Sequence, residues 1–261
     1  MTSTNWQGGQ NHLIFSVFPI REFEPSIGKS MRASSGLSDI NYRPGFDISL
    51  PPHTIRQERL HVITNPTRKF LAVMPQIKGI DLTLRQKMQG LERGGNDGII
   101  SLSPCGGKIE ERCDQNFDTV KYPDILSDAR FCIVLDNEYD SGQTIMDALH
   151  HGCIPVIVYS SAVLPFSEVI DWKRFSLRIY DHDLESLHNV LSNVSEKRIS
   201  EMQSQIHFVY NKYFSSWKAI INTTLSILND RIIPHHAKTL KHWNQPPTVH
   251  EGNPLFLRYE F

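Results

Sequence analysis

The sequence predicts an α/β protein built on a parallel sheet, and three observations support this prediction. Residues 131–135 and 154–158 are unbroken apolar runs rich in β-formers, which suits strands buried on both faces of a parallel sheet. Between them, apolar residues repeat at helical spacing at Ile145, Met146 and Leu149. The chain has 261 residues, enough to bury a sizeable core. The first two observations together describe one βαβ unit.

The turn inside this unit is where a ligand is expected. Ser141 can cap the helix, and Gly152 stands where a left-handed C-cap residue belongs. In open α/β sheets, ligands lie beyond the carboxyl ends of the strands, where helix N-termini direct free N–H groups at phosphates. The loop 136–142 therefore lies where a nucleotide diphosphate would bind.

Other elements follow from the same patterns. Further strands are expected at 69–74, 98–102 and 175–180. A helix is expected at 82–91, and another is expected to begin after Asp183 as its N-cap and to run through Leu191. Two more helical stripes follow and are expected to face the core. The first comprises Ile199, Met202, Ile206, Val209 and Tyr213, and the second comprises Trp217, Ile221, Leu225 and Leu228.

The four cysteines form two candidate pairs. Cys105 and Cys113 bracket a polar loop, whereas Cys132 and Cys153 stand at the starts of the two strands of the βαβ unit. Both pairs could reach disulfide geometry in an oxidising compartment, and the alternative is four buried thiols in a reducing one.

Two N-glycosylation sequons begin at Asn193 and Asn222, which fits exposure to a secretory lumen.

Charge and composition exclude several function classes. A net charge of −1 and a pI near 6.9 argue against a nucleic-acid reader. One cluster is a candidate for polyanion binding, and it consists of His235, His236, Lys238, Lys241 and His242. The alternative is that these side chains form a solvated helix face. No metal site is predicted there, because no second carboxylate or Cys stands at ligand spacing. No apolar run approaches the ~20 residues of a membrane anchor or a signal-peptide core.

Several sequence blocks in a fixed order resemble the exostosin glycosyltransferase family along nearly the whole chain. The blocks at the C-terminal end are most similar to the second of the two heparan-polymerising exostosins. The blocks are 6–15 (WQGGQNHLIF), 42–50 (YRPGFDISL), 131–132 (FC), 152–156 (GCIPV), 164–172 (LPFSEVIDW), 229–247 and 253–257 (NPLFL). Such an ordered series is specific, whereas any one block alone is not.

The resemblance implies a GT-B fold, in which two Rossmann-like domains face each other across a cleft. The implied division is a partial acceptor-side domain at 1–65, a nucleotide-sugar-binding domain at 66–228, and a return helix and tail at 229–261. It also implies heparan sulfate elongation from UDP-sugars in the Golgi or endoplasmic reticulum lumen, in a complex with a paralogous exostosin subunit. A full exostosin is longer, with an N-terminal anchor and a second transferase domain. We therefore expect that this chain corresponds to a piece of an exostosin, and that its residues 1–60 fold poorly on their own.

The turn departs from the family pattern in its charge. Asp136 and Asn137 stand where family members carry Arg-Gly, and Glu138 and Asp140 follow. An Arg fork suits a diphosphate, whereas a carboxylate about 6 Å away repels it by roughly 3 kcal/mol at an effective dielectric near 20. The turn is therefore poorly suited to the phosphates of a nucleotide-sugar.

Other candidate donor contacts are retained. Ser141 and Gly142 open the helix, and Asp147 stands where active members carry a carboxylate that holds the donor ribose. Glu168 belongs to the LPFSEV block, and it is the residue of that loop that we expect to lie in the cleft.

Three hypotheses follow. The favoured one is a catalytically degenerate subunit that supports an active paralogue. The second is an active inverting enzyme that transfers glucuronosyl or N-acetylglucosaminyl groups, with an unidentified general base for which Asp47 and Asp81 are possibilities. The third is a non-functional gene fragment. The resemblance implies that no cofactor is required, and the alternative is a manganese ion held by Asp136, Glu138 and Asp140 that bridges the diphosphate.

Overall fold

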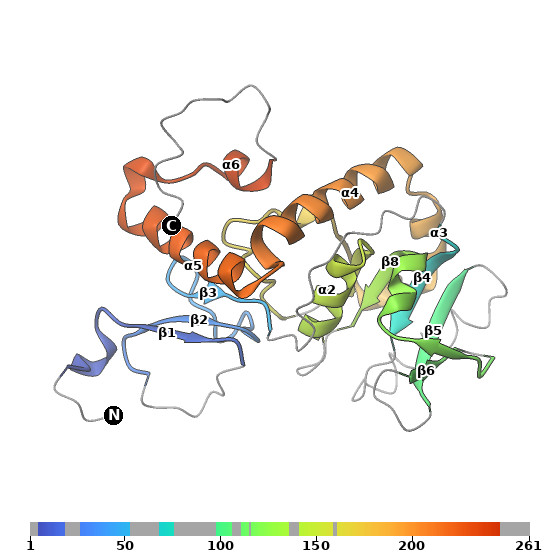
Figure 1. Cartoon of the computed structure of the whole chain (residues 1–261), viewed down its shortest axis with the longest axis horizontal. Coiled ribbons are helices and arrows are strands. Elements are labelled where there is room, and N and C mark those ends of the chain that lie inside the picture. The colour runs from blue at the N-terminus through green and yellow to red at the C-terminus, as the bar shows by residue number, and fades with distance from the viewer. Residues whose placement is uncertain are drawn as a thin grey trace.

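A computed structural model of the chain describes residues 5–18, 27–52, 68–75, 98–105, 111–114, 116–135, 141–158 and 161–245. Within these residues the protein has a three-stranded sheet, a seven-stranded sheet and a group of helices (Figure 1). The mixed α/β architecture confirms the predicted fold class and agrees with a GT-B-like glycosyltransferase fold.

The large sheet carries the βαβ unit. Its strand order is β10-β9-β8-β4-β5-β6-β7, with every pairing from β10 to β5 parallel and the last two antiparallel. The strands are β4 (Phe70–Pro75), β5 (Ile99–Pro104), β6 (Glu111–Cys113), β7 (Thr119–Lys121), β8 (Ala129–Val134), β9 (Ile154–Val158) and β10 (Leu177–Ile179). The β6–β7 hairpin extends the sheet and was not predicted from the sequence.

The strand order locates the ligand crevice of this sheet. The parallel strands β4, β5, β8, β9 and β10 are arranged in space in the order 2-1-3-4-5, as in flavodoxin-like folds. The order reverses between β4 and β8, and ligands bind beyond the carboxyl ends of the strands at such a switch point. Residues 76–97 after β4 and 136–140 after β8 lie outside the described part of the chain.

The helix of the βαβ unit forms where the sequence places it. α2 runs Ser141–His150 and packs against β8 and β9. It ends at Gly152, whose φ of 62° is left-handed, and the N–H of Gly152 donates to the carbonyl of Leu149. The remaining helical elements are η1 (Gln7–Gly9), η2 (Asp124–Asp128), η3 (Trp172–Arg174), η4 (Asp181–Ser186), α3 (Leu187–Ser192), α4 (Glu196–Val209), the π-helix η5 (Tyr210–Phe214), α5 (Trp217–Ile232), η6 (Pro234–His236) and α6 (Leu240–Asn244).

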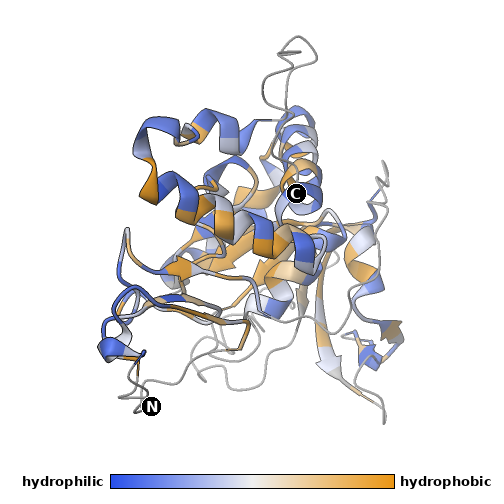
Figure 2. Ribbon diagram, turned by 60° about the vertical axis from the view of Figure 1, so that its left-hand side comes forward, coloured by the Kyte–Doolittle hydropathy of each residue, from blue (hydrophilic) through white to orange (hydrophobic). Residues whose placement is uncertain are grey.

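The small sheet belongs to the N-terminal segment and shares its core with the rest of the protein. Its parallel strands are β1 (Leu13–Ser16), β2 (Met31–Ser34) and β3 (Ile48–Ser49). Ala33, Ile48 and Leu50 are at most 2% exposed and pack in the same apolar cluster as β8, β9, α2 and α4. Figure 2 shows hydrophobic strands of the large sheet behind helices that carry both hydrophilic and hydrophobic residues. A shared core agrees with the prediction that residues 1–60 fold poorly alone, which itself stays a prediction.

Both cysteine pairs form disulfides, so the free-thiol alternative is wrong. Cys105 and Cys113 tie the end of β5 to β6, and Cys132 and Cys153 tie β8 to the residue before β9. The second pair is fully buried.

Some predicted elements differ from the structure. The expected strands at 69–74, 98–102 and 175–180 correspond to β4, β5 and β10. The expected helix at 82–91 lies outside the described residues. Asp183 does not cap a helix, because η4 begins at Asp181 and α3 begins only at Leu187. The first apolar stripe is confirmed, since all of its members are buried.

The second apolar stripe is wrong for two of its four residues, because Ile221 and Leu225 are exposed, whereas Trp217 and Leu228 are partly buried. Ile221 is 43% and Leu225 55% exposed, whereas Ile220 and Ile227 are 4% and 2% exposed. Thr223 and Thr224 complete the buried face by donating their hydroxyls to carbonyls four residues back, which satisfies them without water. Periodicity alone could not choose between two neighbouring faces when two threonines stood on the buried one.

A matched pair of substitutions tests this assignment. Ile227→Val should lower the free energy of unfolding by about 1 kcal/mol, because it removes a buried methyl group. Ile221→Val, the same chemical change on the same helix, should cost less than about 0.5 kcal/mol. Denaturant titration of both variants measures the difference, and equal losses would mean that α5 buries the other face.

Candidate functional site

The start of α2 lies against the N-terminal segment. A Cβ built on Gly142 would lie 3.0 Å from Cγ of Pro52, so the chain leaving β3 touches the first turn of α2. This first turn also follows the carboxyl end of β8, the edge where a diphosphate is expected. Ser141 begins α2, so both predicted helix-start residues lie in its first turn, and the contact with Pro52 is made at Gly142.

Asp147 lies on α2 and is already engaged by protein donors. Its carboxylate is 5% exposed, accepting from the Tyr122 hydroxyl at 3.0 Å on Oδ2 and from Nε2 of Gln143 at 2.9 Å on Oδ1. Burial, and then the nearby Asp147 charge, raise the pKa of Tyr122, which keeps its hydroxyl a donor. A ribose at Asp147 would share these oxygens with Tyr122 and Gln143.

The acidic turn itself lies outside the described residues. Asp136, Asn137, Glu138 and Asp140 connect Leu135, which is fully buried after β8, to the start of α2. Their predicted effect on a diphosphate stays a prediction, as does the manganese alternative. Among the residues that the structure describes, no group of three or more His, Cys, Asp or Glu could hold a metal ion.

Glu168 joins the N-terminal segment to the rest of the protein. Its Oε1 accepts from the Ser49 N–H at 2.6 Å and from the Tyr42 hydroxyl at 2.9 Å, and Ser49 Oγ donates to Oε2 at 3.3 Å. Burial raises the pKa of the Glu168 carboxyl, although these donors oppose the shift. The structure therefore gives Glu168 a connecting role, and its contact with a nucleotide-sugar stays a prediction.

Backbone hydrogen bonds extend this connection along the segment 161–168, which follows β9. Ser38 and Ala162 form an antiparallel bridge, and the Phe166 N–H donates to the Ser49 carbonyl at 2.8 Å. From α5, the Arg231 guanidinium donates to the carbonyls of Phe46 and Asp47 at 2.7 and 3.1 Å. The N-terminal segment is therefore held by backbone and side-chain contacts from two separate parts of the chain.

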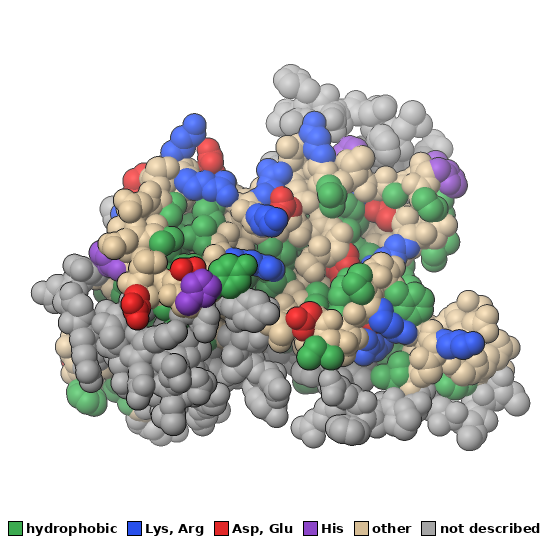
Figure 3. Space-filling model, turned by 180° about the vertical axis from the view of Figure 1, so that it is seen from behind, with side chains coloured by type: hydrophobic (Ala, Val, Ile, Leu, Met, Phe, Trp, Pro, Cys, Tyr) green, Lys and Arg blue, Asp and Glu red, His purple; other side chains and the backbone are tan. Residues whose placement is uncertain are grey.

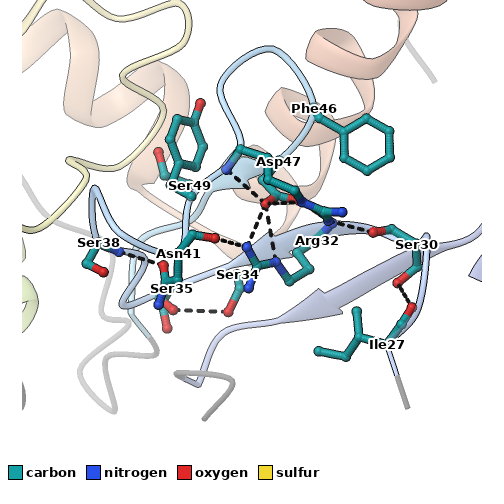
Figure 4. Close-up of polar contacts among 12 residues, drawn as sticks. Ile27, Ser30, Arg32, Ser34, Ser35, Ser38, Asn41, Phe46, Asp47 and Ser49 are labelled. Carbon is teal, nitrogen blue, oxygen red and sulfur yellow. Dashed lines mark hydrogen bonds and ion pairs between the residues drawn. The ribbon is translucent and has the colours of Figure 1, made fainter. Parts of the chain in front are cut away.

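A buried ion cluster organises the N-terminal segment. The Asp47 side chain is 0% exposed and lies 2.8 Å from the Arg32 guanidinium (Figure 4). It also lies 2.6 Å from the Arg43 guanidinium. Burial alone would raise the pKa of Asp47, but hydrogen bonds from Arg43 and Arg32 outweigh it and hold this pKa below its usual range. Asp47 is therefore not free to act as the general base that the sequence offered, and Asp81 lies outside the described residues.

A cavity of about 410 Å³ opens between the loop 42–45 and the C-terminal helices. It is lined by Tyr42, Pro44, Gly45, Glu168, Val169, Ile227, Asp230, Arg231, Lys238, Leu240 and Trp243. None of these residues belongs to α2 or to the large sheet, so the cavity is distinct from the predicted diphosphate position.

Both sequon asparagines are exposed. Asn193 is the C-cap residue after α3, and its side-chain amide donates to the Asn189 carbonyl, whereas Asn222 lies on the outer side of α5. Thr224, the third residue of the second sequon, is 2% exposed, and glycosylation at Asn222 stays a prediction.

The comparisons with known proteins agree with this fold. A family model of the Exostosin GT47 domain matches residues 1–194. The chain belongs to the exostosin GT47 family. It is 32% identical over 272 residues to Exostosin-2 of Mus musculus and 31% identical over 271 residues to that of Homo sapiens. It is 29% identical over 269 residues to Exostosin-1a of Danio rerio.

The alignments cover almost all of this exostosin chain but only part of its relatives. The Exostosin-2 matches span 97% of the chain and 38% of each relative, and the Exostosin-1a match spans 93% and 36%. The greater identity with Exostosin-2 agrees with the sequence blocks that resemble the second paralogue. In the described part of the chain, no helix combines the length and apolar character needed to cross a membrane.

Proposed function

We propose that this chain is an exostosin-type glycosyltransferase domain of heparan sulfate biosynthesis that has lost donor binding and supports an active paralogue in the secretory pathway. The acidic turn after β8 carries the proposal. Asp136, Glu138 and Asp140 follow β8 in the sequence, and β8 borders the switch point of the large sheet, where ligands such as a nucleotide diphosphate bind beyond the carboxyl ends of the strands. Three carboxylates there outweigh the half-charge equivalent of the α2 N-terminus.

Two features of the described residues support this proposal. Asp147 already accepts hydrogen bonds from Tyr122 and Gln143 on both oxygens, so a ribose would compete with them. The N-terminal segment is held to the rest by Glu168 and Arg231, so the fold does not depend on a bound donor to join its parts. A well-packed domain with a disabled donor site is what a supporting subunit needs.

An active inverting UDP-sugar transferase is the alternative, and the retention of Asp147 on α2 favours it. In that case the α2 N-terminus would bind the diphosphate and Asp147 the ribose. The two hypotheses differ in one measurable property, which is the affinity of the folded protein for UDP.

Isothermal titration of UDP and UDP-glucuronic acid, with and without manganese, tests the proposal. We expect no binding at micromolar concentrations by the native chain. Asp136→Arg, which restores the family's cation, should raise the affinity at least about tenfold, since roughly 3 kcal/mol of repulsion is replaced by attraction. Asp118→Arg, the same charge change in the exposed turn before β7, should leave binding unchanged.

Each alternative outcome has a definite meaning. Metal-independent micromolar binding by the native chain would contradict the proposal and support the active enzyme. Binding only with manganese would instead support a metal clamp at Asp136, Glu138 and Asp140. A raised thermal midpoint on adding UDP is the independent readout, because a ligand that binds only the native state must stabilise it.

A further inference from the structure

The turn of the β6–β7 hairpin displays the ring of Phe117, which is 86% exposed. The φ of Phe117 is 66°, in the left-handed region that Gly and Asn adopt readily and a bulky residue seldom does. Asp114 holds this conformation, because its carbonyl accepts from the Phe117 N–H at 3.1 Å. Its Oδ1 also accepts from the N–H groups of Asn116 and Asp118, both at 2.9 Å. The turn therefore fixes a large apolar side chain outside the core, in a backbone conformation that suits smaller residues better.

The chemistry of this turn indicates the kind of surface that it fits. Strained backbone is concentrated at binding sites, and buried aromatic side chains are frequent anchors of protein interfaces. Two acidic residues, Asp114 and Asp118, flank the ring in the sequence, and Asp118 is exposed. The matching surface is therefore an apolar cavity with basic side chains around it.

The cavity between the loop 42–45 and the C-terminal helices is large enough for a phenyl ring. Its volume is about 410 Å³, whereas a cavity of about 150 Å³ in a protein core already holds benzene. Val169, Ile227 and Leu240 supply apolar lining, and Leu240 is 65% exposed. An aromatic side chain that enters from outside would therefore meet apolar groups.

Basic side chains stand around the same cavity. Arg231 and Lys238 line it, and Lys241 is exposed on α6. The cavity also contains the carboxylates of Glu168 and Asp230, but both already accept hydrogen bonds from protein donors. Acidic groups that flank an incoming ring would therefore find cations at this cavity.

The hairpin turn and the cavity are far apart within one copy of the chain. β6 lies at one end of the molecule and α6 toward the other (Figure 1). The ring of Phe117 can therefore reach this cavity only in another copy. On the face shown in Figure 3, basic and acidic side chains are interspersed, so attraction between broadly charged faces is not expected and the complementarity is local.

We propose that Phe117 of one copy inserts into the 42–45 cavity of a second copy, in a head-to-tail contact. Asp114 and Asp118 then lie against Lys238 and Lys241. Because the contact joins two different surfaces, each copy can add another, and association continues past the dimer unless a ring closes. A contact anchored by one side chain is small and therefore weak, so association should require high concentration. The contact does not involve α2 and is independent of nucleotide binding.

Sedimentation equilibrium of the full chain over a range of concentrations tests this contact. We expect the average mass to rise with concentration, and Phe117→Gly to weaken association at least about tenfold. Gly suits the left-handed turn, so this variant keeps the hairpin while it loses the ring. The control is Leu225→Ala, which removes an apolar side chain that is 55% exposed and does not line the cavity. It should change association less than about twofold.

A mixture of two variants distinguishes a head-to-tail contact from a symmetric one. Leu240→Glu keeps the ring of Phe117 but places an acid at the cavity, where it repels Asp118 of the incoming turn. Phe117→Gly keeps the cavity but lacks the ring. Neither variant should associate alone at concentrations where the native chain does. Mixed together, they should form a 1:1 pair that grows no further, because each contributes one intact surface.

Several outcomes would overturn the proposal. A native chain that stays monomeric throughout the concentration range would show that the turn does not enter the cavity. Association of Leu240→Glu alone as strong as that of the native chain would place the contact elsewhere, as would a mixture that forms no pair. Phe117-dependent binding of a monomeric chain to uncharged phosphatidylcholine vesicles would assign the ring to a membrane surface instead.

Discussion

Asp47→Ala should lower the free energy of unfolding by about 3–5 kcal/mol, because it leaves two arginines around a buried site with no counter-charge. The Asp47 carboxylate is fully buried and accepts from Nε and a terminal nitrogen of both Arg32 and Arg43. Its backbone donors are the N–H groups of the same two residues. One carboxylate therefore fixes β2 and the loop before β3.

Chemical denaturation at neutral pH measures the loss, with Asp118→Ala as the control. Asp118 is exposed in the turn before β7, so its removal should change stability by less than about 0.5 kcal/mol. Asp47→Asn keeps the shape but not the charge and should fall between the two. If Asp47→Ala lowers the free energy of unfolding as little as Asp118→Ala does, water must hydrate the two arginines in place of the carboxylate.

The pH dependence of Asp47 has a definite sign. Because its folded pKa is depressed, Asp47 contributes stability that is fully present above the ordinary Asp value of about 3.9. This stability is lost as the pH falls through the folded value. The native chain should therefore lose stability below about pH 4 more steeply than Asp47→Asn does.

The sequence predicted the local elements of the core well, because their signals are local. The βαβ unit follows from apolar runs, a cap and Gly152 within a short stretch of chain, and the disulfide between Cys132 and Cys153 joins its two strands. The face of α5 could not be predicted in the same way. Thr223 and Thr224 are polar by type but satisfy their hydroxyls inside the helix, so only the packed structure shows that they are buried.

The contacts that join the N-terminal segment to the rest of the protein could not be predicted from the sequence, because they link residues far apart in the chain. Ser49 and Glu168 are 119 positions apart, and Phe46 and Arg231 are 185 apart. From its residue type alone, Asp47 was a candidate general base. The structure shows that it instead pairs with Arg32 and Arg43 and has a structural role. Strand order likewise emerged only from pairing, and with it the switch point between β4 and β8.

Glu168→Ala should lower the free energy of unfolding by about 3 kcal/mol. It leaves the Ser49 N–H, which donates to Oε1 at 2.6 Å, without its acceptor beside a new cavity. Glu168→Gln can keep an oxygen toward Ser49 and Tyr42 while its amide donates to Ser49 Oγ, so its loss should be under about 1 kcal/mol. Glu185→Ala, an exposed glutamate of η4, is the control and should be neutral within about 0.5 kcal/mol.

The pH dependence of Glu168 is opposite to that of Asp47. Its folded pKa is raised by burial, so the folded state binds this proton more tightly than the unfolded chain does. The contribution of Glu168 is therefore most favourable at low pH and declines as the pH rises from the ordinary Glu value of about 4.3 through the folded value. Relative to the native chain, Glu168→Gln should become more stable between pH 4 and pH 7, as measured by denaturation at both values. A constant difference would show that the ionised carboxylate is fully compensated by Ser49 and Tyr42, and that the N-terminal segment is joined to the rest without an electrostatic cost.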